Sequence, residues 1–280
     1  MKTIKARHKL IPAIIMLIVA AITMSTASYA WFTMSNRVEV TGINLEVVAP
    51  TNILIREKKD TEPFNNPFSN TVSLSTSSGI TGKLNHASSV DGLYMFTVGN
   101  PTEDILLNGT LTGTASIIST STPVASTDGY YVDFFLELVN TGEYDVVVGL
   151  DSLTIAPVTN SVTGGNIEGA VRFAILENDT TTTSKGVFGK GELTTVVAYS
   201  GSGTESTGEQ TVLTTSADVF TLYGGGSANS STPAKMKSIT VRVWIEGQDP
   251  DCVTANAGSS FSIEFDFYVA KTLTTTTTTP

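Results

Sequence analysis

The chain has 280 residues, a formal charge of −10, 40% hydrophobic residues and 15% charged residues. This acidic balance argues against nucleic acid and anionic membrane surfaces as partners, because both attract cationic proteins. Cys252 is the only cysteine, so no disulfide can form within the chain. Its stability must therefore come from core area, sheet closure or assembly.

The N-terminal segment, residues 1–30, has the three parts of a secretory signal: a basic head, an apolar run over residues 10–21 and a small-residue exit. We predict cleavage between Ala30 and Trp31. A second small-x-small site ends at Ala27, and an uncleaved signal anchor is the alternative. Loss of the four cations of this segment lowers the charge of −10 by four, to −14. The sequence thus predicts a secreted protein of the extracellular matrix or cell surface, without a membrane partner once the signal is removed.

Apolar and polar residues alternate repeatedly after the signal, whereas helical periodicity is hard to find. Such alternation is typical of strands that pack one face on a core and expose the other to water. About ten strands predict an all-β fold, a jelly-roll-like antiparallel β-sandwich preceded by the signal-peptide helix. The predicted strands are residues 38–48, 53–57, 93–98, 131–138, 145–155, 170–176, 194–199, 219–223, 239–245 and 261–269.

The predicted domain organisation is one sandwich with loop insertions over residues 31–271 and a disordered threonine-rich tail over residues 272–280. A separate lobe inserted around residues 156–235 is the alternative. Residues 110–128 and 201–208 are rich in Ser, Thr and Gly and are predicted to be loops. The sequence Asn-Thr-Gly-Glu at residues 140–143 separates two strand patterns and predicts a hairpin turn.

Catalytic motifs are missing from the sequence. The two histidines are His8, within the signal, and His86, so a zinc peptidase motif is excluded. There is no Gly-x-Ser-x-Gly nucleophile elbow, and nothing supports a nucleophilic pair of Cys252 with His86. We therefore expect no enzymatic activity and no catalytic residues. A pair of carboxylates in a glycosidase-type cleft stays open, because the sequence does not place acids in space.

An acidic turn follows the predicted strand 239–245 and contains Glu246, Asp249 and Asp251. Oxygen-rich turns bind Ca²⁺, which takes six to eight oxygen ligands. Proline and aspartate are also ordinary turn residues. The turn therefore has two interpretations, a structural turn and a Ca²⁺ site, and no other metal or cofactor is expected.

The junction Tyr29-Ala30-Trp31-Phe32-Thr33, followed by a strand-forming segment, resembles the proteins exported through the SipW-type signal peptidase of Gram-positive bacteria. This family includes the biofilm matrix fibre protein TasA and the camelysins. The strand patterns around residues 131–153 and 238–270 are similar to those of the family. The resemblance implies a jelly-roll sandwich whose N-terminal segment completes a sheet of the next subunit. The donor would be residues 31–40, with Trp31, Phe32, Val38 and Val40 as its apolar residues.

Three functional hypotheses follow. The first is a structural subunit of extracellular fibres or biofilm matrix, with itself as main partner and other matrix or cell-surface components as further partners. An aromatic N-terminus supports it, because Trp31 and Phe32 bury large apolar areas; these rings could equally fold back onto their own domain. The second is a surface module that binds glycans or other ligands through an aromatic platform around Trp244 or Tyr130. The third is an acid-dependent hydrolase.

Overall fold

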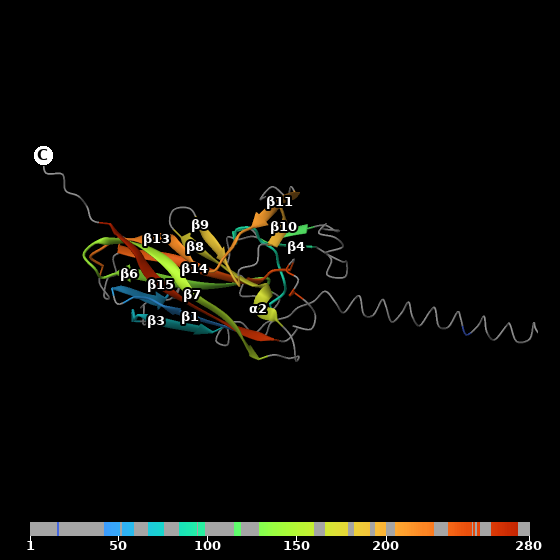
Figure 1. Ribbon diagram of the computed structural model, residues 1–280, viewed down its shortest axis with the longest axis horizontal. Coiled ribbons are helices and arrows are strands. Elements are labelled where there is room, and N and C mark those ends of the chain that lie inside the picture. Colours follow the sequence, from blue (N-terminus) through green and yellow to red (C-terminus); the bar gives the residue numbers. More distant parts are fainter. Residues whose placement is uncertain are drawn as a thin grey trace, which may run out of the picture.

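Strands dominate the described part of the chain, which confirms the predicted all-β class (Figure 1). Apart from Met16, the predicted signal lies outside the described residues, as do its cleavage site at Ala30 and the predicted donor residues Trp31, Phe32, Val38 and Val40. The computed structural model describes residues 16, 42–50, 52–58, 67–75, 84–93, 95–98, 115–118, 129–159, 166–178, 182–190, 194–199, 205–226, 235–247, 249, 251–252 and 259–273.

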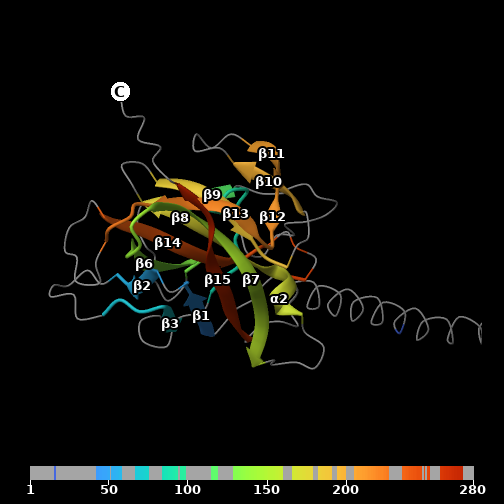
Figure 2. The same ribbon diagram turned by 60° about the vertical axis from the view of Figure 1, so that its left-hand side comes forward.

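The first of two large sheets has five strands in the order β13-β7-β15-β1-β3. Its central strands, β7 and β15, are long and run antiparallel (Figure 2). By contrast β1 pairs in parallel with β15, so the prediction of a purely antiparallel sandwich is wrong here. These two strands come from opposite ends of the chain, and no short turn forces them to be antiparallel. The bounds are β1 Gly42–Val48, β3 Thr71–Ser75, β7 Asp145–Thr159, β13 Ser216–Leu222 and β15 Ser260–Leu273.

The second large sheet has six strands in the order β12-β9-β8-β14-β6-β2. Its centre, β14, pairs antiparallel with β8 and with β6. Strands of the region 156–235 therefore belong to both large sheets. The bounds are β2 Ile53–Glu57, β6 Val132–Asn140, β8 Val171–Asn178, β9 Thr182–Phe188, β12 Val212–Leu213 and β14 Met236–Ile245.

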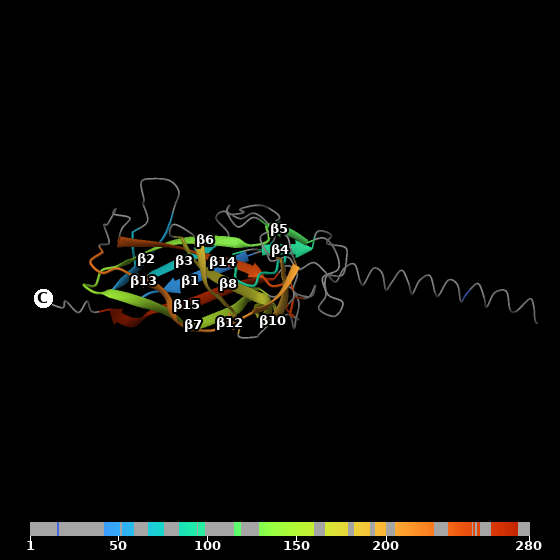
Figure 3. The same ribbon diagram turned by 90° about the horizontal axis from the view of Figure 1, so that it is seen from above.

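Two strand pairs and a short helix complete the described structure. They are β4 (Met95–Val98) with β5 (Ala115–Ile118), which Figure 3 labels side by side, β10 (Thr194–Tyr199) with β11 (Glu205–Gln210), and helix α2 (Ile167–Ala170). β5 and part of β11 fall in segments that were predicted to be loops. Ser and Thr are common in loops, yet Thr is also a good strand former, so composition alone does not separate the two states.

The connection between β6 and β7 corrects the predicted hairpin, because these strands belong to different sheets. The Asn140 side chain shapes the turn: its amide donates to the Tyr144 carbonyl at 2.8 Å, and its oxygen accepts from the Gly142 N–H at 2.9 Å. A polar Asn-Gly-type sequence therefore carries the chain from one sheet to the other. The amino-acid sequence of a turn that connects two different sheets therefore resembles that of a hairpin turn within one sheet.

The predicted tail also begins too early. Thr272 and Leu273 still belong to β15, where they pair with Val146 and Asp145 of β7. The described strand thus ends two residues beyond the expected boundary, because the long partner β7 offers backbone groups to that point. Residues 274–280 lie outside the described part.

A row of aromatic rings joins the two large sheets. Phe173 of β8 stacks on Phe188 with ring centroids 5.2 Å apart and on Phe265 of β15 at 5.1 Å. Phe265 then meets Phe267 edge-on at 5.3 Å, and Phe267 meets Phe220 of β13 edge-on at 5.4 Å. These side chains are buried within one contiguous core that contains residues from both sheets. Their contacts hold the two sheets face to face.

The six-stranded sheet is buried on its outer face as well. Ile239 to Ile245 of β14 are all buried, although their alternation predicts one exposed face. A second apolar cluster explains the difference, since Trp244, Tyr131 and Ala174 pack there against Ala87 and Met95. Part of the chain before β6 therefore forms an additional layer over this sheet.

Candidate functional site

The acidic turn after β14 is built into this additional layer. Glu246 is fully buried, and its carboxylate accepts hydrogen bonds from Ser88 Oγ at 2.5 Å, Gln210 Nε2 at 2.9 Å and Trp244 Nε1 at 3.2 Å. The backbone continues the contact, because Gly247 N donates to the Ala87 carbonyl at 2.8 Å. Glu246 thus fastens the layer to the end of β14 through neutral donors.

Asp249 is held by a buried arginine. Arg172 of β8 is fully buried, and its Nη2 lies 2.6 Å from Asp249 Oδ2. The same guanidinium donates to Gln210 Oε1 at 3.1 Å and to the Gly169 carbonyl at 2.5 Å. Gln210 therefore links the Arg172–Asp249 pair to Glu246 in one polar network, called the buried polar cluster below.

The hydrogen-bond partners of Asp251 differ from those of Glu246. Asp251 Oδ2 accepts from Asn166 Nδ2 at 2.9 Å, and the Asp251 backbone N–H donates to Asp249 Oδ1 at 2.9 Å. Glu246, Asp249 and Asp251 are thus near one another in the chain but serve different protein donors. Within the described ranges, no three His, Cys, Asp or Glu side chains are placed to hold a metal ion. Ca²⁺ binding stays a prediction, which a shift in melting temperature on adding Ca²⁺ would support.

Arg172 and Gln210 were not singled out from the sequence. The available signal was one cation inside the apolar run of β8, residues 171–176. A charge in such a strand needs a buried partner, because an isolated buried ion is costly. The sequence did not show that Asp249 would be that partner.

Cys252 ends this turn and is partly buried. Burial, with the carboxylates of Glu246 and Asp249 adding to it, raises the pKa of its thiol well above the ordinary range. Since the thiolate is the reactive form, we expect a disulfide reagent at pH 8 to react at least about 100-fold more slowly with the folded chain than with the urea-unfolded chain. Thionitrobenzoate absorbance measures both rates, and equal rates would contradict this environment.

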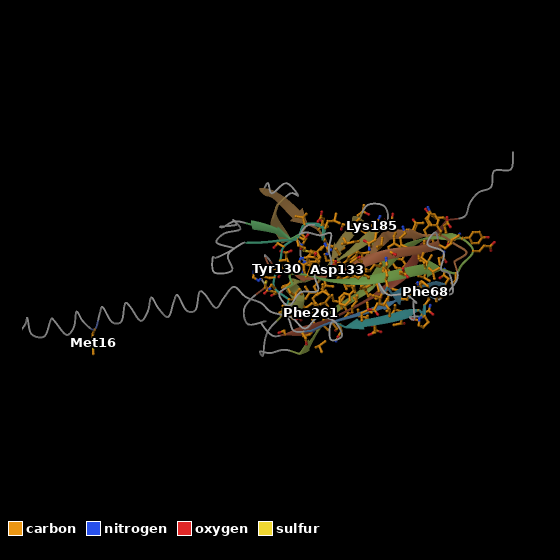
Figure 4. The ribbon with its side chains drawn as sticks, turned by 180° about the vertical axis from the view of Figure 1, so that it is seen from behind. Met16, Phe68, Tyr130, Asp133, Lys185 and Phe261 are labelled. Atoms are coloured by element: carbon orange, nitrogen blue, oxygen red, sulfur yellow. The ribbon has the colours of Figure 1, made fainter. Side chains whose placement is uncertain are left out.

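Ion pairs continue along the outer face of the six-stranded sheet. Arg242 binds Asp133 through two bonds of 2.7 Å, and Arg56 lies 2.6 Å from Glu137. Figure 4 labels Asp133 and, nearer one end of the sheets, Phe68, whose ring centroid lies 4.3 Å from the Arg56 guanidinium. Burial raises the pKa of Asp133, and the Arg242 guanidinium opposes that rise.

Both of these pairs are direct cross-strand neighbours in the register of the sheet, and each joins β6 to an adjacent strand. Opposite charges at such positions stabilise strand pairing. The pairs therefore fix the register of β2, β6 and β14. They could have been found from the sequence only once the order of the strands was known.

Glu177 of β8 is paired with two lysines, Lys185 and Lys237. Burial raises the pKa of its carboxyl, but hydrogen bonds from both lysines outweigh burial and bring the pKa below its ordinary value of 4.5. Because the pKa of Glu177 is lower in the folded chain than in the unfolded chain, its ionised carboxylate stabilises the fold. This contribution is present above pH 4.5 and is lost as the pH falls through the pKa of the folded state.

We expect Glu177→Gln to lower the free energy of unfolding by about 0.5–1 kcal/mol at pH 7. The difference from the parent chain should shrink towards pH 3, where the parent carboxylate is being protonated. Urea denaturation at both pH values measures it. A difference that grows as the pH falls would contradict the assigned direction.

Exposed aromatic residues gather at one end of the five-stranded sheet. Tyr144 and Tyr223 are 48% and 56% exposed and adjoin Asp145 and Leu222. Asp145 pairs with Leu273 and Leu222 with Val146, so both tyrosines lie at the end where β15 finishes. Trp244, expected in an aromatic platform, is instead fully buried, and Tyr130 is partly buried against the second apolar cluster.

The edges of the sheets differ in how they are protected. β2, at the edge of the six-stranded sheet, is tied to the residues just before β3, at the edge of the other sheet, by the bridge between Ile55 and Ser69, whose two backbone bonds are 2.7 and 2.9 Å long. β12 has only two residues. β13 carries a register shift between Ser216 and Phe220. Short, bulged or linked edges are the usual means of preventing unwanted strand addition.

Fold and contacts define an all-β protein with two mixed sheets, a shared aromatic core and a buried polar cluster on one outer face. No protein-family model, curated protein or solved structure matches the chain. Across the described segments, no helix is long and apolar enough to cross a membrane.

Proposed function

We propose that the chain is a secreted, non-enzymatic structural protein whose copies assemble into extracellular fibres or matrix through the N-terminal segment, residues 31–40. One observation carries the proposal. β1, the first described strand after this segment, lies inside the five-stranded sheet between β15 and β3. The segment is therefore continuous in sequence with a core strand. A contact that another copy makes with the segment would be passed directly to the sheet.

The chemistry of the segment supports strand addition. Residues 31–40 contain the aromatic pair Trp31-Phe32 and the alternating sequence Val38-Glu39-Val40. An extended segment added to a sheet gains backbone hydrogen bonds, and its alternate side chains fill pockets. Export without disulfides also favours assembly as a source of stability.

The test compares three full-length chains secreted by a Gram-positive host: the parent, Trp31→Ser with Phe32→Ser, and Val158→Ser. Val158 is 54% exposed, so its replacement removes exposed apolar surface elsewhere. We expect large species in analytical ultracentrifugation for the parent and Val158→Ser and their loss in the double variant. Equal assembly of all three would overturn a role for the N-terminal aromatics. N-terminal sequencing shows in the same samples whether Trp31 is the first residue.

A second candidate, a surface module for glycans, is favoured by the exposed rings of Tyr144 and Tyr223. Aromatic faces at one end of a sandwich suit sugar rings, and loops there provide polar groups. A glycan array probed with the parent and with Tyr144→Ala/Tyr223→Ala tests it. Binding that disappears in the double variant, from a chain that stays monomeric, would put this function first.

A further inference from the structure

The buried polar cluster brings together a hydroxyl, a carboxylate and a carboxamide. The Ser88 hydroxyl donates to Glu246 Oε1 at 2.5 Å. The side-chain amide of Gln210 donates to the other oxygen of the same carboxylate, Glu246 Oε2, at 2.9 Å. One carboxylate therefore holds a nucleophile and an acyl group next to each other, although Ser88 precedes β4 and Gln210 ends β11.

The orientation of the Gln210 amide is set by its partners. Its Oε1 accepts from Arg172 Nε at 3.1 Å, and its Nε2 donates to the Ser89 carbonyl at 2.5 Å as well as to Glu246. A guanidinium only donates, and carbonyl and carboxylate oxygens only accept, so the reversed amide would lose these bonds. The carbonyl oxygen of Gln210 thus faces a positive charge, and its nitrogen faces a carboxylate.

Burial separates these groups from water. Glu246, Gln210 and Arg172 are fully buried, and the serine that precedes β4 is 6% exposed. Groups held in contact react as if at a very high concentration, because the entropy of bringing them together is already lost on folding. A guanidinium also stabilises a developing negative charge more strongly in a low dielectric than in water. Exclusion of water further protects a reactive acyl group from hydrolysis.

We propose that Ser88 and Gln210 become joined by an ester bond in the folded chain. Glu246 acts as the base and takes the hydroxyl proton while Ser88 Oγ attacks the side-chain carbon Cδ of Gln210. The negative charge that develops on Gln210 Oε1 faces the Arg172 guanidinium. The bond from Cδ to Nε2 then breaks, and Glu246 returns the proton to the departing nitrogen, with which it is already in contact.

The reaction is balanced without any further reactant. The ester bond from Oγ to Cδ replaces the amide bond from Nε2 to Cδ, and one ammonia leaves. The proton that leaves the hydroxyl is the one that the ammonia carries away. Each chain reacts once with itself, so no turnover follows, and the step does not depend on fibre formation.

The neighbouring serine is placed differently. The Ser89 hydroxyl accepts from the Gly92 N–H at 2.8 Å, and the Ser89 backbone N–H donates to Glu246 Oε2 at 3.4 Å. The Ser88 hydroxyl instead donates to the carboxylate at 2.5 Å, which is the arrangement that a base needs to remove its proton. The geometry therefore assigns the nucleophile to Ser88.

The ester would tie the additional layer to the end of β11. Ser89, beside the nucleophile, and Gln210 are 121 residues apart in the chain. A covalent bond that closes so long a stretch restricts the unfolded chain strongly, as a disulfide does. Cys252 is the only cysteine, so the chain has no disulfide of its own for this purpose.

Mass spectrometry of the full-length folded chain tests the bond directly. Once its N-terminus has been sequenced, the denatured parent should be lighter than its sequence by one ammonia. A protease digest should contain the peptide with Ser88 joined to the peptide with Gln210. Mild hydroxylamine should separate the two peptides, because it cleaves esters and leaves amides intact. Separate peptides with unmodified Ser88 and Gln210 in the folded parent would overturn the proposal.

A matched pair of variants tests the nucleophile. Ser88→Ala and Ser89→Ala each remove one hydroxyl from adjacent residues. We expect Ser88→Ala to lose the linked peptide and Ser89→Ala to form it as the parent does. Ser88→Thr, which restores a hydroxyl, should regain it. A link that persists in Ser88→Ala and disappears in Ser89→Ala would contradict the assignment.

Glu246→Gln tests the base, because it keeps the shape of the side chain and removes its charge. The linked fraction is followed by mass with time after refolding from urea-solubilised inclusion bodies. We expect the variant to form the link at least about 100-fold more slowly than the parent. Formation at the rate of the parent would overturn the role of Glu246. If this variant does not fold, the mass of the parent and the two serine variants still decide whether the bond forms.

Discussion

Replacing Arg172 with methionine is expected to lower the free energy of unfolding by about 3–5 kcal/mol. The variant leaves the carboxylate of Asp249, a residue that is only 4% exposed, without its cation. It also removes the donor to the Gln210 side chain and the Gly169 carbonyl. Urea denaturation followed by tryptophan fluorescence measures the change, because Trp244 lies in the same buried polar cluster.

Two controls show whether the loss comes from the buried pair. Adding Asp249→Leu to Arg172→Met removes the unpaired charge and should recover part of the stability. Lys190→Met breaks the exposed pair of Lys190 with Glu168, where the lysine side chain is 46% exposed, and should change stability by about 0.5 kcal/mol at most. Equal losses for Lys190→Met and Arg172→Met would contradict the assigned role of Arg172.

Replacing Phe265 with alanine is expected to cost about 3–5 kcal/mol. The ring is fully buried and lies between Phe173 of one sheet and Phe267 of its own strand. Alanine leaves a cavity at the point where the two sheets meet. Thermal and urea unfolding measure the loss.

A matched control for Phe265→Ala is Tyr223→Ala, which removes an aromatic ring that is 56% exposed. It should change stability by about 0.5 kcal/mol at most. Phe265→Leu keeps most of the volume and should lose less than half as much as Phe265→Ala. A loss of about 1 kcal/mol or less for Phe265→Ala would contradict the packed aromatic row.

Strands with strong alternation were predictable from local sequence. Ile53–Glu57 matches β2, and the run from Phe261 lies within β15. Long-range pairing was not predictable, because period-two alternation says which face is apolar but not which strand is the neighbour. The sequence accordingly could not show that β1 joins β15 in parallel or that β6 and β7 separate into different sheets.

The candidate site was predictable only in part. The acidic turn of Glu246, Asp249 and Asp251 was noticed as a cluster, but its partners come from distant parts of the chain, 158 residues away for Ser88 and 77 for Arg172. Trp244 alternates with apolar residues and therefore resembles an exposed surface aromatic. The covering layer that buries it is recognisable only in three dimensions.

Negative-stain electron microscopy of the secreted chain beginning at Trp31, beside a version lacking residues 31–40, tests the central claim most directly. We expect filaments from the longer chain and separate particles from the shorter one, because the donor segment is then missing. Filaments from both would place the joint elsewhere in the molecule. Separate particles from the longer chain, across concentration and pH, would contradict assembly and leave the glycan-binding function ahead.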